Sequence, residues 1–161
     1  MTPEIRHIYV SPGHNYVGHH GQEPGTHPMT EVAEVECVAG KGLQGDRYFD
    51  HKEDFKGQIT FFDWTVYEEL VNHFQRTDLS PSAMRRNVLI DGLDLDRLIG
   101  ATFEIQGIQF SGSQESAPCY WMNRAVAEGA EEFMRGRGGL RARILTDGVL
   151  QAGPSPFRVL D

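Results

Sequence analysis

Cysteine is scarce in this sequence, and long apolar runs are missing. Only Cys37 and Cys119 occur among the 161 residues. This excludes a scaffold held together by several disulfides, although one bond between the two cysteines stays open. No apolar stretch approaches the ~20 residues that a membrane-spanning helix needs. The opening segment MTPEIRHIYV has neither a basic region nor a long apolar core, so we expect no signal peptide. We therefore expect a cytoplasmic protein with two reduced thiols and no membrane contact.

Positive charge is also in short supply. Fifteen Lys and Arg residues stand against 23 Asp and Glu residues, which gives a formal net charge of −8. An acidic chain binds duplex nucleic acid and anionic membranes poorly, so we expect no nucleic-acid partner. The basic residues nevertheless gather in the short clusters MRRN (84–87) and RGRGGLRAR (135–143). Such clusters could form a local anion pocket.

The common catalytic motifs are absent as well. The chain has no phosphate-binding loop, dinucleotide-binding fingerprint, nucleophile elbow or HExxH motif, and no signature of Ser/His/Asp catalysis. It also lacks internal repeats, low-complexity tracts and linkers. We therefore expect residues 1–161 to form a single domain.

Glycine, by contrast, is abundant, with 18 residues, and favours tight turns between short strands. Alternation of apolar and polar residues predicts strands in the segments 5–11 and 29–40. Short strands are also expected in the segments 58–62 and 85–92, the second of which ends at Asp91-Gly92. Two hairpins are expected, one in 101–113 around Gln106-Gly107 and one in 140–153 around Asp147-Gly148. Strands connected mainly by hairpins favour a mainly β fold, a β-barrel with a few peripheral helices, over a doubly wound parallel sheet.

Two helices are expected outside the barrel. The first follows Asp63, a candidate N-cap, and places Val66, Leu70 and Phe74 on one face. The second lies within residues 112–134, where Met122, Val126, Ala130 and Phe133 form one apolar stripe. A single helical turn is expected at 93–100.

Cys119 stands directly behind Pro118, at the predicted start of the second helix. Ser116 could cap this helix, and proline suits a first turn because its missing N–H is not needed there. Unsatisfied backbone N–H groups at a helix start stabilise a thiolate, the form that attacks sulfur or ligates a soft metal. The alternative is a small buried hydrophobic residue. Packing is the better interpretation for Cys37, which lies in an alternating strand without a basic neighbour.

Three further groups are candidates for binding an anion or a metal. Arg47, in GLQGDRYFD, could present a planar fork to an anion, although a turn with a surface ion pair is the simpler interpretation. Alternation from the MRRN cluster sends Arg85 and Asn87 to one face of a strand and Arg86 to the other. Arg85 and Asn87 suit a phosphate or a pterin, or else a solvated strand end. The histidine-rich loop, residues 11–28, matches no zinc spacing.

Four segments of the chain together resemble the MOSC domain, the C-terminal domain of molybdenum cofactor sulfurases, which also occurs as stand-alone bacterial proteins. In the order of the family's motifs, they are GLQGDRYF, RRNVLIDGLDLDRLIGATF, QESAPCYWM and GGLRARILTDGVLQAG. The resemblance extends from about residue 5 to residue 153 and implies a strand-rich barrel. It matches Cys119 to the family's defining cysteine, which carries a persulfide sulfur or ligates the molybdenum of a bound pterin.

The resemblance also implies a set of residues around the pocket. Arg47, Arg85 and Asn87 match positions that line the cofactor pocket in cofactor-binding relatives. The loop after the first strand borders that pocket, so His14 and Asn15 are expected to approach it. This loop is longer and richer in histidine here than in the family's pattern.

Three functions follow as hypotheses. In the first, the protein binds molybdenum cofactor (molybdopterin) with Cys119 as the metal thiolate. It would then reduce N-hydroxylated small molecules with electrons from a partner reductase, because the chain has no flavin, haem or iron–sulfur motif. In the second, Cys119 carries sulfur loaded by a cysteine desulfurase, and pyridoxal phosphate sits on that partner. In the third, the barrel is a non-catalytic module that binds an anionic metabolite.

The histidine-rich loop gives a testable prediction. If His14 and Asn15 belong to a lid over the pocket, while His19 and His20 face solvent without zinc, the double variant His14→Ala/Asn15→Ala should lose activity. The wild type should depend on pH between about 6 and 7, where histidine titrates. Activity of the double variant that equals the wild type across this pH range would remove the lid. Stoichiometric zinc in tag-free protein would support a metal site instead.

Overall fold

Short strands make up most of the regular structure in the computed structural model, which describes residues 2–13, 25 and 27–160. The first six strands of the described chain are β1 (Glu4–Val10), β2 (Thr30–Glu31), β3 (Glu34–Val38), β4 (Gly42–Leu43), β5 (Ile59–Asp63) and β6 (Val88–Asp91). The others are β7 (Thr102–Ile105), β8 (Ile108–Glu115), β9 (Leu140–Ile144), β10 (Gly148–Gln151), β11 (Gly153–Pro154) and β12 (Phe157–Val159).

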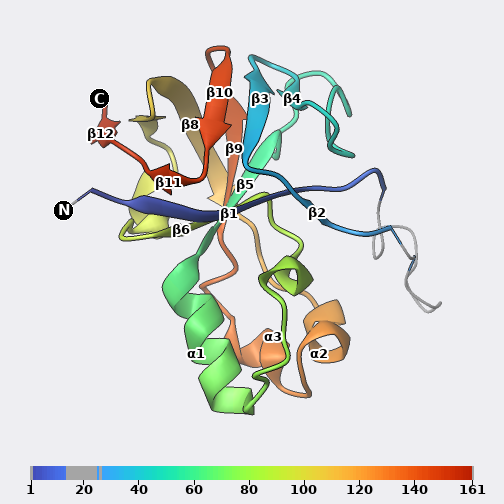
Figure 1. Cartoon of the computed structure of the whole chain (residues 1–161). Helices are drawn as coiled ribbons and strands as arrows, with labels where there is room; N and C mark the ends of the chain where they lie inside the picture. The colour runs from blue at the N-terminus through green and yellow to red at the C-terminus, as the bar shows by residue number, and fades with distance from the viewer. Residues whose placement is uncertain (1, 14–24, 26, 161) are drawn as a thin grey trace.

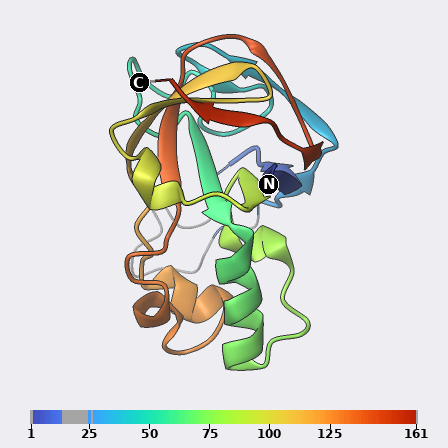
Figure 2. The same cartoon turned by 90° about the vertical axis from the view of Figure 1, so that its left-hand side faces the viewer.

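The helices are fewer and gather at one end of the strand layer, below it in Figures 1 and 2. They are α1 (Trp64–Phe74), α2 (Trp121–Ala125) and α3 (Ala130–Phe133), with the 3-10 turn η1 (Pro81–Met84). A second 3-10 turn, η2 (Leu95–Leu98), contacts the strands β5, β8 and β9 instead. No helix of the described residues is long and apolar enough to cross a membrane.

Two sheets share the strands. The larger has the order β11-β1-β6-β5-β9-β8-β7-β12, with β2 added to β1, and the smaller has the order β10-β3-β4. All pairs are antiparallel except β5 and β6. A parallel pair needs a crossover connection, and α1 and η1 lie on the chain between these two strands. This crossover therefore carries α1 below the sheet.

The prediction of a mainly β fold is confirmed, but the barrel is not closed among the described strands. The larger sheet ends at β11 on one side and β12 on the other. These two strands come from one extended segment, 153–159, and are separated by only two residues. They run one after the other rather than side by side, so no ladder joins the two edges.

Central strands β5 and β6 bury both of their faces. Phe61 and Val88 belong to the core between the two sheets, whereas Phe62 and Leu89 pack against the helices. All four side chains are inaccessible to solvent. Burial on both faces explains why ITFF and VLI read as continuous apolar runs in the sequence.

Two local predictions are confirmed. The side chain of Asp63 accepts a hydrogen bond from the Thr65 amide and caps α1, on which Val66 and Leu70 are buried. Strands β7 and β8 form the expected hairpin, and Gln106 and Gly107 both have the positive φ that a tight hairpin turn requires.

Two other predictions are wrong. The single helix expected within 112–134 is split into α2 and α3, and Gly129, with φ of 94°, precedes α3 in a left-handed conformation. The hairpin expected in 140–153 does not form, because β9 already has β5 and β8 on its two sides. Strand β10 pairs with β3 of the smaller sheet instead.

Gly112 gives the first prediction from the fold. Its amide and carbonyl bond to Ala101 and Gly100, and a Cβ added here would lie 1.9 Å from the Leu98 carbonyl oxygen. A backbone carbonyl cannot swing aside as a side chain can. Gly112→Ala should therefore lower the free energy of unfolding by about 3 kcal/mol, at the upper end of overpacking costs, as measured by urea denaturation. Ser111→Ala on the same strand is the control and should change it little. Equal stability of the two variants would contradict the close approach.

Candidate functional site

One open cavity of about 400 Å³ includes two of the predicted site residues, Arg47 and Arg85, in its lining. Its walls come from the loop after β4, from β5, from the segment before β6, from the end of β8 and from β9. The lining residues are Arg47, Tyr48, Gly57, Thr60, Arg85, Arg86, Gln114, Glu115, Ser116, Ala117 and Arg141. Four arginines and one glutamate make this a basic site on an acidic chain.

Three neighbouring strands each supply one side chain to the same wall. Arg141 of β9 lies directly opposite Thr60 of β5 and opposite Gln114 of β8. Directly opposite residues of antiparallel strands point to the same face. The register of β8 shifts between Gly112 and Gln114, and bulges of this kind re-aim side chains near functional sites.

The Arg141 side chain is placed by what lies beneath it. Its guanidinium sits 5.2 Å from the centre of the Phe55 ring. A Cβ on Gly57 would come within 2.8 Å of Arg141 Nε, so glycine makes room for the arginine. The sequence placed Arg141 only within a basic cluster. Arg141 alternates with the apolar residues Leu140 and Ala142, which are buried. This alternation could have predicted that Arg141 points away from the core, toward a possible ligand.

Arg47 lines the cavity and is held by several partners. Its Nη1 donates to Asp46 Oδ1 at 3.2 Å, its Nη2 donates to the Arg85 carbonyl oxygen, and its guanidinium lies 4.8 Å from the Tyr48 ring centre. Asp46 is itself buried and accepts from the Ser11 amide. The predicted surface ion pair is therefore a buried one, which fixes the direction of Arg47.

Arg85 also lines the cavity, and much of its hydrogen-bonding capacity is used within the fold. Its Nη1 donates to the His27 carbonyl oxygen, and its Nη2 donates to Ser11 Oγ and to the Gly13 carbonyl oxygen. Arg85 thereby ties the segment after β1 to the entrance of β6.

Asn87 is not among the residues that line the cavity. Its Oδ1 accepts from the amide and the hydroxyl of Thr60, and its Nδ2 donates to the Tyr9 carbonyl oxygen. With a relative exposure of 1%, it is a structural link between β1, β5 and β6.

Arg86 reaches the cavity, although alternation placed it on the opposite face from Arg85. Strand β6 begins only at Val88, and Arg85 has a positive φ of 51°, so strand alternation does not extend back to these arginines. The Arg86 guanidinium donates to the carbonyl oxygens of Gly138, Met84 and Ser116 at 3.0–3.1 Å.

The charge of Arg86 is stabilised and destabilised by different neighbours. The pKa of Arg86 is lowered to about 10, mainly by burial and also by repulsion from Arg47 and Arg141. Cys119 and Tyr48, when negatively charged, act in the opposite direction and raise it. Arg86 is partly exposed where it meets the cavity and enclosed elsewhere.

Cys119 is exposed and follows the cavity-lining Ala117 by two residues. It does not sit inside a helix start as predicted, because α2 begins at Trp121 with Tyr120 as its N-cap. The Cys119 carbonyl oxygen accepts from the Met122 amide, so the thiol directly precedes the helix. Helix α2 has only five residues, and the predicted dipole effect is correspondingly small.

Glycine at position 138 lets the loop that carries Cys119 pack closely. A Cβ there would lie 2.2 Å from the Ser116 carbonyl oxygen and 2.7 Å from Pro118 Cδ. The Gly138 amide donates to Glu115 Oε2 at 3.2 Å. Pro118 therefore packs against Gly138 in the turn before β9 and does not begin a helix.

Cys37 lies on β3, is inaccessible to solvent and belongs to the core between the sheets. Burial raises the pKa of the Cys37 thiol to about 12. It therefore stays neutral near pH 7, and its surroundings agree with the packing interpretation.

His14 and Asn15, together with His19 and His20, lie outside the described residues. Among the residues that the structure does describe, no group of three or more His, Cys, Asp or Glu side chains could hold a metal ion.

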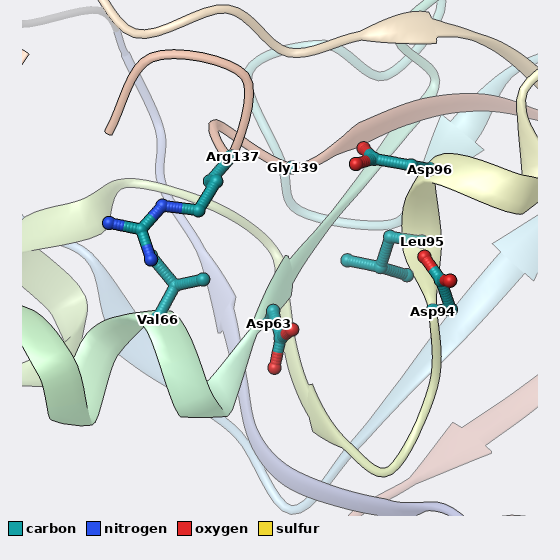
Figure 3. Close-up of a pocket in the computed structure, with 7 residues that line it drawn as sticks. All are labelled: Asp63, Val66, Asp94, Leu95, Asp96, Arg137 and Gly139. Carbon is teal, nitrogen blue, oxygen red and sulfur yellow. The ribbon is translucent and has the colours of Figure 1, made fainter. Parts of the chain in front are cut away.

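A second, smaller cavity of about 130 Å³ lies between α1, η2 and the turn before β9 (Figure 3). Three of its four charged lining residues already serve the fold: Asp63 caps α1, Asp94 pairs with Arg97 at 3.2 Å, and Arg137 pairs with Glu69. The fourth, Asp96, lies in the first turn of η2. The arginine-lined cavity of about 400 Å³ is therefore the candidate site.

The chain is similar to one protein family and to several solved structures. The family model described as the MOSC domain matches residues 20–155. The YuaD protein of Bacillus subtilis has a similar crystal structure, with a TM-score of 0.75, 16% identity, and coverage of 98% of this chain and 95% of that chain. YiiM from Escherichia coli has a TM-score of 0.69 and 18% identity, covering 100% of this chain and 70% of that chain. YiiM from Geobacillus stearothermophilus has a TM-score of 0.66 and 19% identity, over 99% and 75% of the two chains. No curated protein matches in sequence.

The placement of Asn87 gives a prediction that separates a structural from a binding role. Asn87→Leu would leave the Thr60 amide and the Tyr9 carbonyl without their partner inside the protein. Each unsatisfied buried group costs about 1–3 kcal/mol. The variant should therefore lose about 2–4 kcal/mol of unfolding free energy, measured by urea denaturation of cofactor-free protein. If the cofactor-free variant is as stable as the wild type, Asn87 has no structural role, and the predicted role in ligand binding is favoured instead.

Proposed function

Because this chain belongs to the MOSC domain family, we propose that it binds molybdenum cofactor at the arginine-lined cavity, with Cys119 as the thiolate ligand of the metal. The observation that carries the proposal is the exposed Cys119 thiol beside a cavity lined by four arginines. We place the protein in the cytoplasm, where both of its cysteines stay reduced.

The residues around the cavity fit such a group. Thiolates suit soft metal centres, and guanidinium forks suit phosphate. Arg47 is pre-oriented by buried Asp46, and Arg86 and Arg141 line the same cavity. Arg85, which also lines the cavity, would support the wall through its bonds to the segment after β1. Asn87 would act through Thr60, and His14 and Asn15 stay proposed lid residues.

We propose that the protein reduces N-hydroxylated small molecules. The cofactor, when bound, supplies the redox chemistry at its metal. The chain itself would hold the cofactor through Cys119 and Arg47 and orient the substrate in the open cavity. A separate reductase would donate the electrons, because the sequence has no flavin, haem or iron–sulfur motif.

The exposure of Cys119 also favours a second candidate, a sulfur carrier. The Cys119 thiolate would attack the outer sulfur of a persulfide on a cysteine desulfurase. A new S–S bond would form at Cys119, and the desulfurase cysteine would leave as a thiolate. Pyridoxal phosphate would act on the desulfurase, and Cys119 would later pass its outer sulfur to an acceptor. If neither function holds, the cavity is a binding module for an anionic metabolite.

The test is the replacement of Cys119 by serine. Serine is nearly isosteric, but its hydroxyl stays protonated and is a hard, weak ligand. We expect Cys119→Ser to fold normally and to lose nearly all bound molybdenum when produced in cells that make the cofactor. Metal analysis by mass spectrometry and pterin fluorescence measure this loss. Wild-type molybdenum content in the variant would refute the thiolate ligand.

Cys37→Ser is the matched control. It should keep the molybdenum content, because Cys37 is buried in the core. Molybdenum-free wild-type protein that carries a persulfide on Cys119 after incubation with a cysteine desulfurase would favour the sulfur carrier. A folded Cys37 variant that has lost function would indicate a mechanism with two cysteines.

A further inference from the structure

Two of the cavity's four arginines lack an anionic partner. Arg47 pairs with buried Asp46. Arg86 and Arg141, in contrast, form no ion pair with any carboxylate of the described chain. Unpaired charges are costly where water is partly excluded, so partly enclosed cations usually have a partner.

Arg86 keeps hydrogen-bonding capacity for a ligand. A guanidinium has five N–H groups, and three of those of Arg86 donate to the carbonyl oxygens of Met84, Ser116 and Gly138. Carbonyl oxygens orient the guanidinium but do not neutralise it. One N–H on each terminal nitrogen remains for a group in the cavity that Arg86 lines.

Arg141 stands at the junction of two cavities. Besides the cavity next to Cys119, it lines a neighbouring open cavity of about 510 Å³. The other lining residues of that cavity are Lys52, Glu53, Asp54, Phe55, Lys56, Gln114 and Arg143. The guanidinium of Arg141 contacts the Phe55 ring, which leaves its charge uncompensated. Arg47 and Arg141 both repel the charge on Arg86, so the three cations act on one region.

We propose that Arg86 and Arg141 form a subsite for a phosphate-like dianion beside Cys119. Two guanidinium forks match the two charges of a phosphate and offer paired donors to its oxygens. This subsite deepens the proposed function, on which it rests for the identity of the ligand. The phosphate belongs either to the bound cofactor or to a substrate that carries a phosphate group.

Calorimetric titration with inorganic phosphate at constant ionic strength tests the subsite. Wild-type protein should bind phosphate saturably, and Arg86→Met or Arg141→Met should weaken binding at least about tenfold. Arg86→Lys keeps the positive charge but loses the planar guanidinium. Its affinity for phosphate should lie between that of the wild type and that of Arg86→Met. Arg141→Met leaves the three carbonyl bonds of Arg86 in place, so it reports on the subsite even if Arg86→Met folds poorly.

Arg97→Met is the matched control. Arg97 is exposed, pairs with Asp94 and lies outside both cavities. The variant has the same change in net charge and should bind phosphate like the wild type. Absence of saturable binding by the wild type, or equal weakening by Arg97→Met, would overturn the subsite.

Two further arms separate the subsite from the proposed function. Cys119→Ser should bind phosphate normally, because the subsite does not use the thiol. Wild-type protein that contains no molybdenum when produced in cells that make the cofactor, but whose phosphate binding depends on Arg86 and Arg141, would refute the proposed function and keep the subsite. In cofactor-loaded protein, loss of phosphate binding assigns the subsite to the cofactor's own phosphate, and retained binding assigns it to the substrate.

Discussion

The buried side-chain amide of Asn87 connects the parts of the fold on which the site depends. It bonds to Thr60 on β5 and to Tyr9 on β1, and it stands directly before β6. These strands form the centre of the larger sheet, where the parallel pair β5–β6 sends the chain through α1. Because Asn87 occupies the interior, the arginines before it extend to the wall of the cavity instead. The Asn87 amide thus lies between its buried partners on β1 and β5 and the arginines of the cavity wall.

How far the sequence could predict the fold depended on the distance between the paired segments. The β7–β8 hairpin and the capped start of α1 at Asp63 follow from contacts within a few residues, and both were predictable. The partner of β10 was not, because β3 lies more than 100 residues earlier. A turn at Asp147-Gly148 is compatible with either outcome. Asp147 instead accepts a bond from the Ala39 amide, which helps to hold the two distant strands together.

The site shows the same limit at the scale of single side chains. The basic clusters were visible in the sequence, and the structure brings Arg85, Arg86 and Arg141 to one cavity. The faces of Arg85 and Arg86 were not predictable, because a left-handed residue at Arg85 precedes β6 and interrupts alternation. Arg141 lies within a regular strand, where alternation does hold. Family resemblance located Cys119, but the contact of its loop with Gly138 required the tertiary structure.

The chain as a whole is acidic, whereas its candidate cavity is lined by four arginines. This difference in charge affects which anions the cavity would select. With a net charge of −8, the protein repels anions at long range. At physiological ionic strength this repulsion is screened beyond about 8 Å. An anion would therefore reach the proposed site against a weak background field and would be retained only where arginines contact it directly. Contact geometry, not attraction to the whole surface, would then decide which anion is bound. Such a site would discriminate by the shape and charge of one group, because the chain as a whole offers little non-specific affinity for anions.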